Sequence, residues 1–365
     1  MIWFLAFVLF AIGGAAGFVM HRSDFCLAGA FRDLFLFRQG RMLRILLLLA
    51  VAAMPLYEAG RLLGLLAVPF PLFGPPSLVN PLGGLLFGVG MVLAGGCVVG
   101  TLYKMAAGRL TSLVAFAGLL AGSALYAEIH PWWASLARQG TLAASVTLPR
   151  MLGLPPLLLL APLAAIAGFP LLRWGRQGLL YQESYAEGHL QPWKAALWLV
   201  LLSFASALAV GMPMGVTTAY AKLAGMLENL FIPGHVANLA FFATEPLNFT
   251  HPLWGIPLKG GPGPRLDGIA LAQFPLIAGI LCGSACSALR LGEWRFYVRV
   301  PIKQCLWAFV GGTLMGLAAR MAPACNIWHL MGGLPILAGQ SLLFVAGLFP
   351  GAWLGSRLLR KFVIR

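Results

Sequence analysis

Three of the six cysteines in the sequence stand where helices are expected to break, and their thiols are the groups best suited to chemistry. Cys97 follows a pair of glycines, Cys325 follows Pro323 by two residues, and Cys26 precedes the short apolar segment LAGAFRDLFLF. A thiol is a weak, polarisable donor and a soft acceptor, so it suits a sulfur-bearing solute better than chloride or phosphate. Each cysteine could instead be a small packing residue. Their shared placement at breaks favours a binding site for a soft anion.

The other three cysteines, Cys282, Cys286 and Cys305, lie inside ordinary apolar segments. Cys282 and Cys286 are one helical turn apart, a spacing at which two thiols can ligate a metal. No histidine or carboxylate accompanies them in the sequence, so we expect buried packing residues and predict no metal site. The sequence also lacks a G-x-x-x-x-G-K-[ST] phosphate-binding loop and any cofactor motif, which argues against nucleotide-driven pumping and predicts no cofactor.

Polar residues close to the breaks extend the candidate site. Arg320 stands inside an apolar segment, where an arginine is a functional candidate by default, although it could also cap carbonyl groups at the break. Asn326 could hydrogen-bond an anion or cap the half-helix that follows it. Lys104 is a second candidate for the cation that offsets an anion's charge, but we expect it to extend its amine to the membrane surface instead. For His329 we favour a structural role.

The composition is that of a membrane protein. Hydrophobic residues make up 60% of the 365-residue chain, charged residues only 10%, and the mean hydropathy is +0.87. A soluble protein of this composition would expose large apolar patches to water. The formal net charge of +15 does not indicate nucleic acid as a partner, because the basic residues lie in short loops between apolar segments. The partner that the composition implies is the lipid bilayer.

We predict an all-α polytopic membrane protein with about nine transmembrane helices. Lysine and arginine concentrate in the connections on one side of this arrangement. If the side rich in lysine and arginine is cytoplasmic, the positive-inside rule predicts a multi-pass protein with its N-terminus outside and its C-terminus in the cytoplasm. The spans are predicted at 2–20, 43–67, 82–107, 110–128, 154–172, 195–212, 268–290, 304–331 and 334–356.

The chain also repeats itself. The segment GGLLFGVGMVLAGGC (83–97) aligns with GGTLMGLAARMAPAC (311–325), and a weaker match sets the segment around Cys26 over the segment around Thr217. An extra fifth span between the copies would reverse the second one and produce inverted-topology repeats. We predict a first repeat at 1–130, an extra span with a cytoplasmic linker at 131–193, and a second, inverted repeat at 194–365.

The breaks predict an hourglass pore. Gly95 and Gly96 loosen the helix before Cys97, and the segments that follow Cys26 and Thr217 are short enough to be re-entrant helices that enter from opposite faces. Four helix ends would then converge on the axis of the repeat. The N–H groups exposed at helix N-termini favour an anion over a cation.

The stretches SDFCLAGAFRD, GGLLFGVGMVLAGGCVVG and GLAARMAPACNIWHLMGGLP together resemble the YeeE/YedE family of sulfur-transport membrane proteins, and the resemblance covers essentially the whole chain. It implies an inner-membrane importer of thiosulfate, or of a related inorganic sulfur compound. It also implies that Cys26, Cys97 and Cys325 line the pore and pass the ion along by S–H contacts. A small cytosolic sulfur-carrier protein is the partner that the resemblance suggests.

These observations predict a transporter and not an enzyme. Other functions stay open on the sequence alone, namely transport of a selenium compound or of persulfide sulfur, a membrane sulfurtransferase that relays sulfur on its cysteines, an ion channel, and a scaffold for a sulfur carrier. Glu58 is the one acidic residue deep in a predicted span, so the spans offer few carboxylates that could relay protons. Facilitated diffusion is therefore the default expectation.

Overall fold

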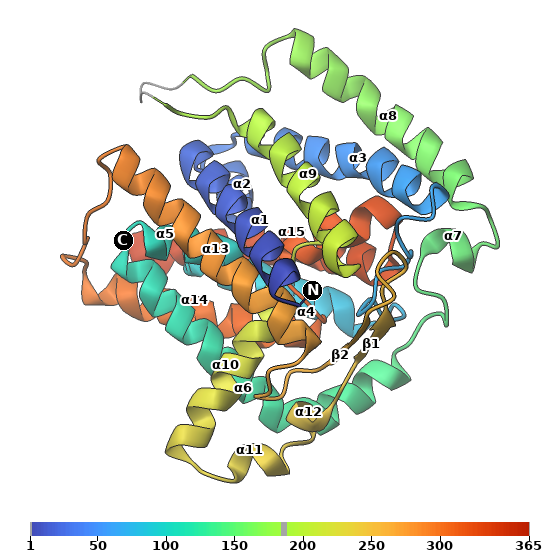
Figure 1. Ribbon diagram of the computed structural model, residues 1–365. Helices are drawn as coiled ribbons and strands as arrows, with labels where there is room; N and C mark the ends of the chain where they lie inside the picture. The colour runs from blue at the N-terminus through green and yellow to red at the C-terminus, as the bar shows by residue number, and fades with distance from the viewer. Residues whose placement is uncertain (1, 184–187, 365) are drawn as a thin grey trace.

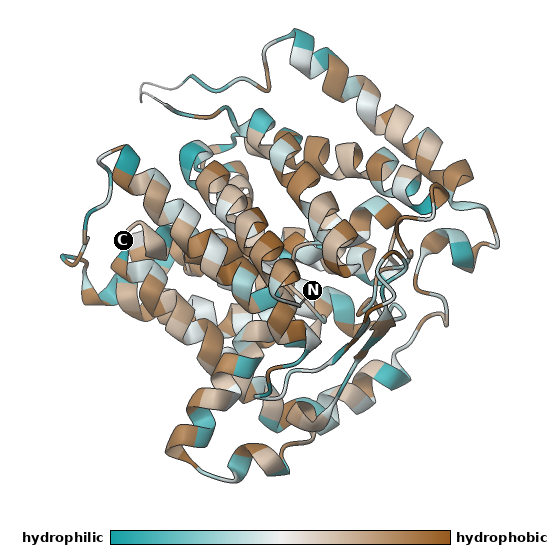
Figure 2. Ribbon diagram, viewed as in Figure 1, coloured by the Kyte–Doolittle hydropathy of each residue, from teal (hydrophilic) through white to brown (hydrophobic). Residues whose placement is uncertain are grey.

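The computed structural model describes residues 2–183 and 188–364, and helices dominate its regular structure (Figure 1). Within these residues, nine helical segments are long and apolar enough to cross a membrane. The long helices are α1 (Ile2–Ser23), α3 (Arg41–Leu62), α6 (Leu110–Gln139), α8 (Pro156–Arg176), α9 (Pro192–Val210), α13 (Gly268–Arg290), α14 (Ile302–Met321) and α15 (Gly339–Leu359). The shorter ones are α2 (Leu27–Phe37), α4 (Val79–Leu93), α5 (Val98–Ala106), α7 (Leu148–Met151), α10 (Thr217–Phe231), α11 (His235–Asn238) and α12 (Ala240–Ala243). The chain is an all-α polytopic membrane protein, as predicted, and Figure 2 shows apolar residues along its bundle helices.

Three helix pairs make the most extensive contacts in the bundle, namely α1 with α13, α4 with α15, and α6 with α14. Each of these six helices carries two glycines spaced four residues apart, and a Cβ added at any of them would meet the backbone of the partner helix. Lipid gives helices no hydrophobic reason to associate, so close backbone contact through small residues has to hold them together. The glycines are Gly13 and Gly17, Gly279 and Gly283, Gly84 and Gly88, Gly347 and Gly351, Gly118 and Gly122, and Gly312 and Gly316.

The remaining contacts pair up in the same way. Helix α9 packs on α3 less extensively than α1 packs on α13, and α15 packs on α4 about as extensively as α6 packs on α14. Helix α4 also meets α14, and α1 meets α9. Two copies of one helical unit would make this pattern of contacts. The expected boundary at residue 130 falls inside α6, which continues to Gln139.

Helix α8 stands apart from both sets, at the upper edge of Figure 1, and it packs mainly on α3. Only Leu160 and Leu171 of its 21 residues are buried. It corresponds to the extra fifth span of the sequence prediction, and its surroundings are those of a helix that faces lipid along most of its length.

Two expectations about individual segments are wrong. The eighth span was expected to continue to residue 331, but α14 ends at Met321, because Pro323 cannot continue the helical ladder. Cys282 and Cys286 were expected to be buried, and both are exposed on α13. The glycine face of α13 packs against α1, which leaves these two thiols on a surface that is open to lipid.

The connection between α10 and α13 packs closely on the helices and contains a hairpin of β1 (Leu247–Thr250) and β2 (Pro257–Gly260). Lys222 of α10 is fully buried and donates hydrogen bonds to the carbonyl oxygens of Gly263 and Arg265. Its amine also pairs with the Asp267 carboxylate at 2.7 Å. Asp267 in turn accepts from two backbone N–H groups at the start of α13, so one ion pair attaches the connection to both helices.

Candidate translocation site

Four short helical segments begin at or directly after residues that the sequence singled out. Helix α2 begins directly after Cys26, α5 directly after Cys97, and α10 at Thr217, and an irregular helical segment over residues 326–336 begins directly after Cys325. The two segments that the sequence predicted as short helices, after Cys26 and from Thr217, do form them.

The break before Cys97 has a defined geometry. Gly95 adopts a φ of 70°, in the left-handed region that glycine enters without steric cost. The Cys97 Sγ accepts a hydrogen bond from the Gly100 N–H at 3.2 Å, so the thiol caps α5. The Thr101 hydroxyl donates to the Cys97 carbonyl at 2.8 Å and fixes the same turn. The thiol is therefore held at the helix N-terminus by its neighbours.

The Cys26 and Cys97 thiols meet over Gly100. A Cβ added to Gly100 would lie 3.2 Å from the Sγ of each cysteine, so only a glycine leaves both sulfurs where they are. The Lys104 amine donates to the Gly95 carbonyl at 3.0 Å and lies 3.8 Å from the Cys26 Sγ. Lys104 therefore satisfies a carbonyl that the break frees, and whether its amine also reaches the membrane surface stays a prediction.

The break before Cys325 is built differently. Ala324 has a φ of 119°, which is strained for a residue with a side chain, and Cys325 is fully buried. The His329 ring supports the break, since Nε2 donates to the Ala322 carbonyl at 3.0 Å and Nδ1 accepts from the Ser341 hydroxyl at 2.8 Å. Both ring nitrogens are occupied in this way, which leaves His329 a structural role.

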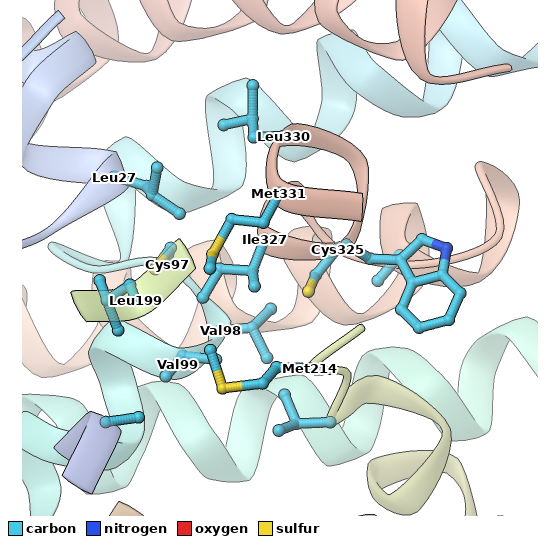
Figure 3. Close-up of a cluster of buried hydrophobic side chains, with 14 of the residues drawn as sticks. Leu27, Cys97, Val98, Val99, Leu199, Met214, Cys325, Ile327, Leu330 and Met331 are labelled. Carbon is cyan, nitrogen blue, oxygen red and sulfur yellow. The ribbon is translucent and has the colours of Figure 1, made fainter. Parts of the chain in front are cut away.

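Sulfur atoms line a small cavity between these breaks, which we call the constriction (Figure 3). Its volume is about 20 Å³, enough for about one water molecule. The cavity is too small for an oxyanion, so the constriction is closed in this structure. Five of its lining residues carry sulfur, namely Cys97, Cys325, Met20, Met214 and Met331.

A larger cavity of about 290 Å³ lies on one side of the constriction and shares Gly215 with it. We call it the Arg320 vestibule, and Thr217, Arg320 and Trp328 line it. Arg320 and Trp328 are 9% and 4% exposed, and the Arg320 Nε and the Trp328 Nε1 have no hydrogen-bond partner among the described residues. Two buried N–H donors without acceptors suit an anion, because a buried donor that forms no hydrogen bond raises the free energy of the folded protein.

A second cavity of about 240 Å³, the Lys104 vestibule, is lined by the basic residues Arg22, Lys104 and Arg109. His21 and His189 also face it, and two acidic residues, Asp24 and Glu293, partly offset the positive charge. Asp24 lies two residues before Cys26 and accepts a hydrogen bond from the Tyr103 hydroxyl at 3.1 Å. This vestibule therefore adjoins the pair of thiols at Gly100.

The structure brings together most of the residues that the sequence singled out. Cys97 and Cys325 line the constriction, and Thr217 and Arg320 line the vestibule beside it. Asn326 lines neither cavity: its side chain is buried with Nδ2 4.0 Å from the Met91 Sδ and with Oδ1 unpartnered among the described residues. Its contact with an anion therefore stays a prediction, and a hydrogen bond between Asn326 and an anion would need the side chain to reach one of these cavities.

Sequence reasoning missed Trp328 and the three methionines of the constriction. Trp328 stands one helical turn beyond Cys325, and an indole N–H at that position of a predicted half-helix was a usable signal. Met20, Met214 and Met331 come from segments far apart in the chain, and a methionine in an apolar span is ordinarily a packing residue.

A helical membrane bundle with a sulfur-lined constriction, a buried arginine in the cavity beside it and a second cavity lined by basic residues is typical of membrane transport proteins. The sequence profile of the family described as "Sulphur transport" matches residues 22–354, and the chain belongs to this family. It is 30% identical over 358 residues to the thiosulfate transporter TsuA of Spirochaeta thermophila, covering 94% of this chain and 97% of that protein. It is 27% identical to TsuA of Escherichia coli, covering 95% of this chain and 92% of that protein. A shorter match, 32% identical over 130 residues, covers 35% of this chain and 26% of the probable transporter YedE of Salmonella typhimurium.

Proposed function

We propose that this protein imports thiosulfate, or a closely related sulfur anion, across the inner membrane through a pore lined by Cys325, Cys97 and Cys26. The observation that carries the proposal is the sulfur-lined constriction between two vestibules with basic residues. The connections rich in lysine and arginine lie on the side of the Lys104 vestibule, so that vestibule would face the cytoplasm. The N-terminus is then periplasmic and the C-terminus cytoplasmic.

The two ends of thiosulfate differ, and so do the groups along the pathway. Its sulfonate oxygens are hard acceptors that match the unpartnered N–H groups of Arg320 and Trp328. Its terminal sulfur is soft and can accept weak S–H hydrogen bonds from Cys325 and Cys97. Sulfate has four hard oxygens, and the apolar walls of the constriction offer them few donors, so sulfate would lose its hydration without compensation.

Passage requires the constriction to widen. The two turns that carry its cysteines are the natural places for movement, because each departs from helical geometry at Gly95 or Ala324. On the far side Cys26 would receive the ion, and the Lys104 amine beside it would offset the charge. We infer that a small cytosolic sulfur-carrier protein accepts the product at the Lys104 vestibule.

The paired helix contacts support the division into repeats. We infer that 1–130 and 194–365 are inverted copies of one unit and that 131–193 holds the extra span and a linker. Such copies would produce matching helix contacts. The α1–α13 contact would match the α9–α3 contact, and the α6–α14 contact would match the α15–α4 contact.

The test is growth and uptake in cells that lack other sulfur importers, with thiosulfate as the sole sulfur source. We expect the chain to restore growth and uptake of labelled thiosulfate, and we expect Cys97→Ala and Cys325→Ala to abolish both. Cys305→Ala is the matched control, since this thiol lies outside the three cavities. Failure of the unaltered chain to restore growth would refute the thiosulfate assignment, and full activity of Cys97→Ala would refute the role of the thiols.

One observation favours a second candidate, a membrane sulfurtransferase. The Lys104 amine lies close enough to the Cys26 Sγ to stabilise a thiolate. That thiolate would attack the terminal sulfur of thiosulfate, form a cysteine persulfide and release sulfite as the S–S bond of thiosulfate breaks. Mass spectrometry of the protein after turnover separates the two functions, because a persulfide on Cys26 supports group transfer and an unmodified thiol supports transport of the intact ion.

A further inference from the structure

Three side chains with metal-ligating atoms meet at one point outside the translocation site. Glu128 comes from the second half of α6, Glu228 from the last turn of α10, and His235 from the first residue of α11. The His235 Nε2 lies 2.7 Å from the Glu128 Oε1 and 3.2 Å from the Glu228 Oε1. One ligand atom from each residue falls within 4.8 Å of the others. The end of α10 and the start of α11, which are neighbours in the chain, thus meet a far earlier part of α6 and bring one nitrogen and two oxygen ligands together.

The charges and hydrogen bonds of this cluster are not balanced within the described residues. The Glu228 Oε2 is buried and has no hydrogen-bond partner, while its Oε1 shares the single His235 Nε2 with Glu128. Two carboxylates around one imidazole leave a net negative charge whether or not the imidazole is protonated. A divalent cation would balance that charge and occupy the unpartnered carboxylate oxygen at once.

The ligand set identifies the class of cation. Zinc takes imidazole nitrogen and carboxylate oxygen at about 2.0–2.2 Å, and magnesium and calcium prefer oxygen alone. The present separations are close to those of ligands around one zinc ion, so small side-chain rotations would complete the set. Glu128 is 46% exposed, which gives a cation access from solvent and leaves room for a water as a further ligand.

We propose that Glu128, Glu228 and His235 form a binding site for a divalent cation of the zinc class. None of the three lines the constriction or either vestibule, so the site is separate from the translocation pathway. Helix α10 begins at Thr217 in the Arg320 vestibule and carries Glu228 near its other end. A bound cation therefore ties the far end of this short helix to α6 and restrains the vestibule wall that α10 provides.

The test uses the full chain purified in detergent and stripped of metal, with zinc chloride as the probe. Calorimetry is expected to show one zinc ion bound per chain, and thermal unfolding is expected to shift to higher temperature with zinc but not with equal magnesium or calcium. X-ray absorption at the zinc edge is expected to show nitrogen and oxygen neighbours without sulfur. This last measurement separates the proposed site from the six cysteines.

Variants decide the assignment. His235→Gln and Glu228→Gln are expected to lose the zinc-dependent shift, and the more exposed Glu128→Gln repeats the test if either of them folds poorly. Glu245→Gln is the matched control, since this carboxylate lies on the same connection but pairs with Arg265 instead. A sulfur neighbour of zinc, the absence of zinc binding, or an unchanged shift in His235→Gln and Glu128→Gln would each overturn the proposal.

Discussion

Lys104 and Arg320 are both cations beside a break, and their hydrogen bonds give them different roles. The Lys104 amine donates a hydrogen bond to the Gly95 carbonyl, so one of its three N–H donors is used to hold the turn before Cys97. The Arg320 Nε is buried without an acceptor, and no carboxylate forms an ion pair with Arg320; both statements hold for the residues that the structure describes. The unmade hydrogen bond makes Arg320 the stronger candidate for direct contact with the anion.

Replacing Arg320 by glutamine tests this contact. A hydrogen bond to a charged group contributes about 1.5–3 kcal/mol, so the KM for labelled thiosulfate should rise by about tenfold to a hundredfold in Arg320→Gln. Arg150→Gln, at an exposed arginine outside the three cavities, should leave the KM unchanged. If Arg320→Gln transports with an unaltered KM, Arg320 serves only to shape the break.

Single residues also mark the limit of what the sequence could predict. The cysteines and Arg320 were found because their types are unusual in apolar spans next to helix breakers. The direction of the Lys104 side chain depends on a carbonyl that is freed nine residues earlier. The exposure of Cys282 depends on which face of α13 is covered by α1. Both are consequences of packing, which local spacing does not encode.

At the scale of elements, the glycine pairs set how closely the helices approach. Gly17 and Gly14 lie on the same helix, but a Cβ on Gly17 would enter the backbone of α13, and a Cβ on Gly14 would make only an ordinary contact at 3.8 Å. The two substitutions to alanine therefore share the same gain in helix propensity and differ in packing.

We expect Gly17→Ala to lower the free energy of unfolding by about 1–3 kcal/mol, because the added methyl group forces α1 and α13 apart. Gly14→Ala should leave it unchanged or raise it by up to about 1 kcal/mol. Chemical unfolding of the two variants in detergent measures the difference. Equal stability of both would mean that the helices separate without cost.

The helix breakers made most elements predictable, and the exceptions have physical reasons. The short helices after Cys26 and from Thr217 were expected from their length. Helix α6 extends beyond the predicted end at 128 to Gln139, because its last turns carry polar residues that read as a loop in a hydropathy scan but continue the helix outside the apolar region. The β1–β2 hairpin escaped notice because its strands have only four residues each.

At the scale of the whole molecule, the proposed pathway is closed at the constriction, whose cavity is much smaller than either vestibule. A small charged thiol reagent should therefore label Cys325 slowly in the absence of thiosulfate, since a cavity of about 20 Å³ does not admit it. Peptide mass spectrometry after timed exposure of membranes measures the rate. Arg150→Cys supplies an exposed thiol for comparison. Labelling of Cys325 as fast as this reference would mean that the constriction is open in the membrane.

The assembled site also shows what sequence reasoning could reach at this scale. The matching segments 83–97 and 311–325 predicted that Cys97 and Cys325 would face a common axis, and both line the constriction. The sequence could not predict that Met20, Met214 and Met331 complete the lining, because nothing local distinguishes them from core methionines. The meeting of Glu128 with His235 likewise depends on the tertiary fold.

Helix α8 has a consequence for how the chain enters the bilayer during synthesis. Its side chains make few buried contacts, so its apolar character rather than packing must keep it inserted. Because α8 lies between α6 and α9, it adds one membrane crossing before α9. A ribosome-bound chain that failed to insert α8 would present every later helix to the translocation machinery from the wrong side. A segment that touches none of the transport chemistry would in this way decide whether the second half can meet the first.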